Sequence, residues 1–138
     1  MSYLKNYIVI VILFLTNCSP KEAPQRICLN ENIMNCKKVP FNSLMKAPKK
    51  FQDTCIELEG YLIFKFERVA LLKLKNMSLR DGAVWLNIVD TLGNQIEEKF
   101  PNGIRGKISV KGVFNCNENE IRKGYIGELK RVTCMEIK

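Results

Sequence analysis

The chain of 138 residues contains no histidine. Catalytic arrangements in which an imidazole activates a serine or a cysteine are therefore excluded. A zinc site would have to use cysteine and carboxylate ligands alone, and the six cysteines include no Cys-x-x-Cys pair. The sequence therefore predicts no metal and no cofactor.

Motifs for other catalytic chemistries are also missing. No glycine-rich loop that would cradle a phosphate precedes a predicted helix. Carboxylates are paired at Glu57 with Glu59 and at Glu97 with Glu98, but neither of these pairs lies in a recognisable cleft motif, as a glycosidase pair would. Glu57 and Glu59 fall instead on the solvent side of a predicted strand. We predict no catalytic residue and a protein that is not an enzyme.

The apolar run near the start of the chain is too short to span a bilayer as a mature helix. It covers Ile8–Leu15, whereas a spanning helix needs about 20 apolar residues. Lys5 precedes the run and Cys18 follows it closely. One basic residue before a short apolar run is typical of a cleavable export signal.

The segment Leu15-Thr16-Asn17-Cys18 resembles the lipobox of bacterial lipoprotein precursors, in which Leu-x-x-Cys follows such a run. The resemblance implies that residues 1–17 are a signal peptide and that the Cys18 thiol carries the lipid. Two or three buried acyl chains then hold the protein on a membrane. Ser19 is not the Asp that retains lipoproteins in the inner membrane of enteric bacteria, so we expect the outer membrane, facing the periplasm. A stray cysteine after an ordinary signal peptide and an uncleaved anchor are the alternatives.

Export also decides how the remaining cysteines are interpreted, because thiols pair in an oxidising compartment. Besides Cys18 the chain has Cys28, Cys36, Cys55, Cys116 and Cys134. Five is an odd number, so at most two disulfides form and one thiol is left over. Spacing alone does not select the connectivity. We expect a local Cys28–Cys36 disulfide, since it would close a short loop without a core of its own.

Residues 18–39 are predicted to hold the lipidated cysteine, a tether over residues 19–27 with two prolines, and the cysteine-closed loop. Residues 40–138 form the expected single domain. The chain carries a net charge of +8, which becomes +7 without residues 1–17, because that segment contains one lysine and no acid. Outside the cytoplasm, a basic surface favours acidic headgroups or an anionic envelope polymer as partners over nucleic acid, which we do not expect.

Period-two alternation over the second half of the chain predicts five strands. A short helical turn is expected first, at residues 40–46, and another turn near residues 96–99. Gly60 marks a bulge or sharp bend in a long first strand. The expected strands are residues 56–66, 69–75, 83–89, 107–114 and 125–137. The fold class is mainly β, a small five-stranded barrel, since closure removes exposed strand edges.

Residues 40–137 resemble small exported OB-fold domains of bacteria. The resemblance rests on the order of the elements and on the segments Gly60-Tyr61-Leu62, Ala83–Leu86, Val110–Phe114 and Gly124–Leu129. This family is largely uncharacterised, so the resemblance implies a fold more than a function. Cys55, Cys116 and Cys134 are departures from its pattern.

Barrels of this type bind extended chains across their second and third strands and the adjoining loops. Rings and cations of that region are the candidate binding residues: Tyr61, Lys73, Lys75, Trp85, Arg122, Lys123 and Tyr125. We therefore predict a lipid-anchored, non-catalytic module that binds an envelope protein or an anionic envelope polymer through this face. The alternatives are an OB-fold hydrolase or nuclease, for which Asp53, Asp81 and Asp90 are too scattered, and an inhibitor or immunity lipoprotein.

The variant Cys18→Ser tests the predicted anchor. Without the thiol no lipid is attached, and we expect the protein to move from the membrane fraction to the soluble or uncleaved-precursor pool. Fractionation with immunoblotting measures this. A mature-sized band that stays with the membrane would contradict the lipobox interpretation.

Overall fold

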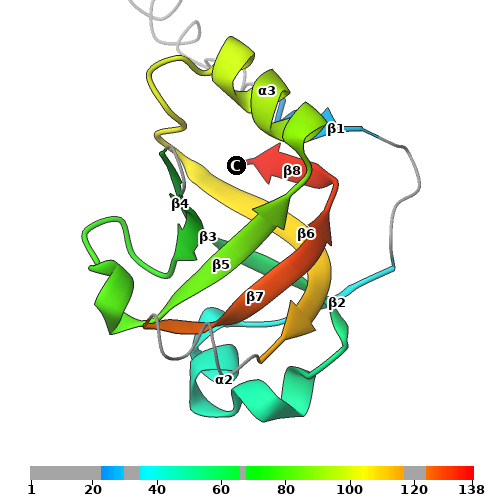
Figure 1. Cartoon of the computed structure of the whole chain (residues 1–138), viewed down its shortest axis with the longest axis vertical. Coiled ribbons are helices and arrows are strands. Elements are labelled where there is room, and N and C mark those ends of the chain that lie inside the picture. The colour runs from blue at the N-terminus through cyan, green and yellow to red at the C-terminus, as the bar shows by residue number, and fades with distance from the viewer. Residues whose placement is uncertain (1–22, 30–34, 66–67, 117–123) are drawn as a thin grey trace, which may run out of the picture.

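Five strands close into a barrel in the computed structural model, which describes residues 23–29, 35–65, 68–116 and 124–138 (Figure 1). The barrel strands are β3 (Cys55–Lys65), β4 (Arg68–Leu72), β5 (Ala83–Ile88), β6 (Lys107–Asn115) and β7 (Tyr125–Val132). Around the barrel they follow the order β3-β4-β5-β7-β6, and β6 pairs again with β3. The pairing of β5 with β7 is parallel and the others are antiparallel. The prediction of a mainly β, OB-like five-stranded barrel is confirmed.

Apolar residues at alternate strand positions fill the barrel, as the period-two pattern requires. Ile108 and Val110 on β6 and Leu58 on β3 are fully buried, and Phe114 is the largest side chain that the core encloses completely. The intervening residues of the same strands face outward. Burial in the interior therefore fixes which residues are left for the outer surface.

A helix packs against each end of the barrel (Figure 1). At one end lies α2 (Phe41–Lys46), followed by the 3₁₀ turn η1 (Pro48–Phe51); at the other end lies α3 (Asp90–Lys99). Leu44 of α2 and Leu92 and Ile96 of α3 are completely or almost completely buried in the core. The sequence predicted α2 correctly, but α3 has ten residues rather than the single turn expected near residues 96–99. A second 3₁₀ turn, η2 (Leu79–Asp81), precedes β5.

The segment predicted as a tether and loop enters the sheet at two places. Strand β1 (Gln25–Cys28) pairs antiparallel with β8 (Cys134–Ile137), and β2 (Lys37–Lys38) pairs parallel with the first part of β3. Ile27 and Val39, at 2% and 3% exposure, pack into the core. The predicted extent of the tether, residues 19–27, and the start of the domain at residue 40 are therefore wrong.

β1 and β2 join the sheet because they pair with strand edges that would otherwise be open. β3 pairs with β4 only from Tyr61 onward, so its earlier edge is open, and β2 occupies it. β8 continues the last strand after an irregular step at Arg131, whose φ is 58°, and pairs with β6. Its outer edge is covered by β1. Covering an edge removes unpaired backbone groups that would otherwise invite aggregation.

The disulfides join these added strands to the barrel. Cys28 bonds to Cys134 and Cys36 bonds to Cys55, so the predicted Cys28–Cys36 pair is wrong. The reason is that β1 and β2 lie at different edges of the sheet, and each cysteine meets a partner on the strand beside it. Cys116 is not in a disulfide and is half-buried, which agrees with the expectation of two bridges and one thiol left over.

These disulfides contribute more stability than a local bridge would. In the chain-entropy account, stabilisation grows with the length of the closed loop. The Cys28–Cys134 separation of 106 residues corresponds to about 4.7 kcal/mol, and the 19-residue separation of Cys36 and Cys55 to about 3 kcal/mol. Such terms matter for a small domain, whose net stability is only about 5–15 kcal/mol.

Gly127 and Gly93 provide a matched pair for testing the packing of the barrel. A Cβ at Gly127 would lie 2.5 Å from Cζ of Phe114 and 2.7 Å from the carbonyl oxygen of Asn115. On α3, a Cβ at Gly93 would meet only Cζ of Phe64, at 3.8 Å. We expect Gly127→Ala to lower the free energy of unfolding by about 2 kcal/mol. Gly93→Ala should raise it by about 0.5–1 kcal/mol, because alanine suits a helix better.

Urea denaturation followed by circular dichroism measures both changes. Equal effects of the two substitutions would contradict the close approach of β7 to the Phe114 ring.

Candidate binding faces of the barrel

The outer surface over β3, β4 and β5 is apolar, although it lies outside the barrel. Ala70, Leu72 and Ala83 are buried there, at 0%, 2% and 0% exposure, in a cluster separate from the main core. The half-buried side chains around them are Tyr61, Ile63, Leu79 and Tyr125. With Trp85 this group forms what we call the aromatic face. Its members come from strands β3, β4, β5 and β7 and from the turn η2.

Three of the residues predicted to bind a partner come together on this face. Tyr61 and Tyr125 border the same buried cluster. The ring centroids of Trp85 and Tyr125 are 5.4 Å apart and their planes meet at 69°, an edge-to-face pair. Such pairing contributes about 0.5–1.5 kcal/mol beyond the burial of the rings and fixes their orientation.

Of the four cations predicted to bind a partner, the structure describes only two. Lys73 and Lys75 lie directly after β4, in the connection to η2; Lys73 is half-buried and Lys75 is exposed. Between them Leu74 is 55% exposed. Arg122 and Lys123 lie outside the described residues, as does Cys18. The structure thus places the predicted rings on one surface, with two lysines following the strand that carries Leu72.

A polar cluster borders Trp85 that the sequence did not reveal. Glu128 of β7 is the register partner of Trp85 and is only 9% exposed. Asn87 donates from Nδ2 to Oε1 of Glu128 at 3.0 Å, and Nζ of Lys130 lies 3.8 Å from Oε2. These residues stand at outward positions of their strands. The period-two alternation of the sequence indicates that these side chains face outward. Only the parallel pairing of β5 with β7, however, brings Asn87 next to Glu128.

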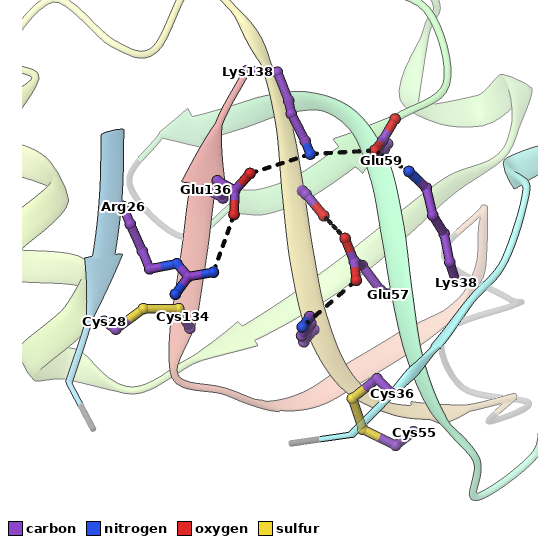
Figure 2. A network of polar contacts seen from close by, with 12 residues as sticks. Arg26, Cys28, Cys36, Lys38, Cys55, Glu57, Glu59, Cys134, Glu136 and Lys138 are labelled. Carbon is purple, nitrogen blue, oxygen red and sulfur yellow. Dashed lines mark hydrogen bonds and ion pairs between the residues drawn. A yellow bond between two sulfur atoms is a disulfide. The ribbon is translucent and has the colours of Figure 1, made fainter. Parts of the chain in front are cut away.

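The remaining outer surface has a different character. Across β1, β8, β6, β3 and β2 it carries a network of opposite charges, which we call the ladder face (Figure 2). Arg26 donates to Glu136 at 3.2 Å, and Nζ of Lys138 lies 3.2 Å from Glu136 and 3.7 Å from Glu59. Lys38 donates to Glu59 at 2.7 Å. Lys138 thereby links the ion pairs of β1 and β8 to those of β2 and β3.

Glu57 lies inside the ladder face and is held in a similar way. Ser109 donates from Oγ to Oε1 of Glu57 at 2.7 Å, and Nζ of Lys111 is 3.6 Å from Oε2. The carboxylates of Glu57 and Glu59 therefore face outward and are both engaged by cations, as expected for a solvent-facing pair. Among the described residues there is no group of three or more side chains suited to hold a metal ion.

The ladder changes the acidity of its members. A hydrogen bond from Lys38 is the main cause that lowers the pKa of Glu59, and Lys138 adds to it. The hydrogen bond from Lys138 lowers the pKa of Glu136 and, reciprocally, raises the pKa of Lys138. Each direction favours the charged form, so the folded state is stabilised while both partners are ionised.

No protein-family model matches the chain, and neither a curated protein nor a solved structure matches it. In the part of the chain that the structure describes, no helix combines the length and apolar character needed to cross a membrane. The fold itself is an OB-like barrel with one apolar and one charge-paired outer face. Function must therefore be argued from these faces.

The lowered pKa values of Glu59 and Glu136 predict how stability depends on acidity. Their contribution is complete above the ordinary glutamate pKa of about 4.3 and is lost as the pH falls through the lower values of the folded state. We expect Glu59→Gln to cost up to about 1 kcal/mol at neutral pH, since the pairs are partly exposed. Below pH 4.5 the difference from the original chain should shrink.

Urea denaturation at a series of pH values measures this. Glu97→Gln is the control, because Glu97 is exposed on α3 and forms no ion pair with the described residues. A constant difference for Glu59→Gln across the acid range would contradict an electrostatic origin.

Proposed function

We propose that this chain is a lipid-anchored lipoprotein of the bacterial envelope that acts as a non-catalytic binding module. The apolar run Ile8–Leu15 followed by Leu15-Thr16-Asn17-Cys18 supports the anchor and the export signal. Two disulfides support the compartment, because disulfides form and persist in oxidising environments. The proposed place is the periplasmic side of the outer membrane, in line with Ser19.

The aromatic face is the observation that carries the binding role. A barrel exterior normally presents polar residues to water, and burying Ala70, Leu72 and Ala83 under partly exposed rings departs from that rule. Partly exposed Tyr and Trp are common at binding surfaces because they bury much area at little entropic cost. The position of this face, over the second and third barrel strands, is also the one through which OB barrels bind extended ligands.

The catalytic alternative lacks a comparable observation. A hydrolase or nuclease needs carboxylates gathered for a metal or for proton transfer. Asp81 instead accepts a hydrogen bond from the backbone N–H of Ser78, the N-cap of η2, and so belongs to the capping box of that turn. Glu57 and Glu59 are bound by lysines. The charge argues against the inhibitor or immunity alternative, because a chain with a net charge of +7 would be repelled by a basic target such as lysozyme.

Site-specific photo-crosslinking tests the binding role. A photoreactive benzoyl-phenylalanine would replace Trp85 on the aromatic face or, as the control, Lys111 on the ladder face. In irradiated cells that produce the lipidated protein, we expect higher-mass adducts from position 85 and few from position 111. Denaturing electrophoresis followed by immunoblotting compares them.

Two further points make the comparison decisive. Both positions are partly exposed on outer strand surfaces, so accessibility alone does not favour position 85. Equal adducts from both positions, or none from position 85, would contradict the aromatic face as the binding surface.

A further inference from the structure

The polar cluster beside Trp85 has groups placed for a ligand. Asn87 uses Nδ2 to reach Glu128, which leaves its Oδ1 as an acceptor that no described residue uses. Lys130 approaches Glu128 only to 3.8 Å, longer than a hydrogen bond, and 43% of its side chain is exposed. Glu128 thus positions one acceptor, Oδ1 of Asn87, and one donor, Nζ of Lys130, at the surface.

The charge of this cluster selects among ligand classes. Glu128 and Lys130 have opposite charges, so the pair is close to neutral. A phosphate or carboxylate seated here would meet the Glu128 carboxylate, and a cationic group would meet Lys130. A neutral group with hydroxyls avoids both repulsions, because it can donate to Asn87 and accept from Lys130.

The rings add the second requirement. Trp85 and Asn87 are two residues apart on the outer side of β5, about 7 Å along the strand, which is close to the width of one sugar ring. The planes of Trp85 and Tyr125 meet at 69°, so the two ring surfaces are inclined to each other and do not form a flat platform for a row of stacked bases. The apolar side of a pyranose ring can lie on one of these surfaces while its hydroxyls reach Asn87 and Lys130.

We propose that Trp85, Tyr125, Asn87 and Lys130 bind a neutral pyranose unit of an envelope glycan, with Glu128 as a positioning residue. This inference rests on the proposed binding function and names its ligand. It extends that function, because the overall basic charge alone pointed to an anionic polymer, whereas this cluster favours an uncharged sugar.

Fluorescence of Trp85 tests the proposal directly, since Trp85 is the single tryptophan of the chain. The purified mature protein would be titrated with a neutral tetramer of β-1,4-linked N-acetylglucosamine and with a uronic-acid tetramer of similar length. We expect a saturable emission shift with the neutral tetramer and weaker binding of the acidic one. Asn87→Ala should weaken neutral binding up to about ten-fold, the effect of one net hydrogen bond.

Glu128→Gln separates positioning from a merely structural role. It should weaken binding of the neutral tetramer and strengthen binding of the acidic one, because Lys130 is then left without its counter-charge. Glu57→Gln is the matched control, since Glu57 also lies on an outer strand surface with one hydrogen bond and one lysine. We expect it to change neither affinity. Loss of stability in Glu128→Gln would weaken both tetramers alike.

The outcomes distinguish the two proposals. Tighter binding of the acidic tetramer by the unaltered protein, or no response of Asn87→Ala, would overturn the neutral-sugar assignment. If neither tetramer shifts the emission, the sugar proposal also fails. Crosslinked adducts from position 85 would then still support the proposed binding function. If no such adducts form either, the proposed binding function is contradicted too.

Discussion

The double pairing of β3 is the constraint on which the rest of the structure depends. Its first part, up to Tyr61, pairs with β6, and from Tyr61 onward it pairs with β4. One strand thereby closes the barrel. Gly60 stands directly before the change of partner, where any side chain would collide with the carbonyl oxygen of Leu72.

This closure also divides the outer surface. The outward positions of β3 include Glu57 and Glu59 before Gly60, and Tyr61 and Ile63 after it. The carboxylates belong to the ladder face and the apolar residues to the aromatic face. A single period-two pattern therefore supplies both surfaces, and the switch between them falls where β3 exchanges β6 for β4.

The sequence predicted most of the barrel because its signals are local. Alternation identified the five strands, and turn residues separated them. The rings Tyr61, Trp85 and Tyr125 were assigned correctly to one region, since the order of strands in an OB-like barrel brings them together. Their role in binding stays a proposal.

The features that the sequence missed depend on contacts between distant segments. β1 and β2 are four and two residues long, too short for a periodic pattern, and their pairing follows from edges that other strands leave open. The Cys28–Cys134 bond joins residues 106 positions apart. Asn87 and Glu128 meet only through the parallel contact of β5 with β7, which no local pattern encodes.

The Cys28–Cys134 bond has a topological consequence. It links the strand nearest the start of the described chain to the strand nearest its end, so the backbone between them forms a covalent ring. A protease that cuts one peptide bond within this ring opens it without separating two fragments. A molecule nicked once in this ring would stay in one piece, with both halves of its barrel still joined through the disulfide.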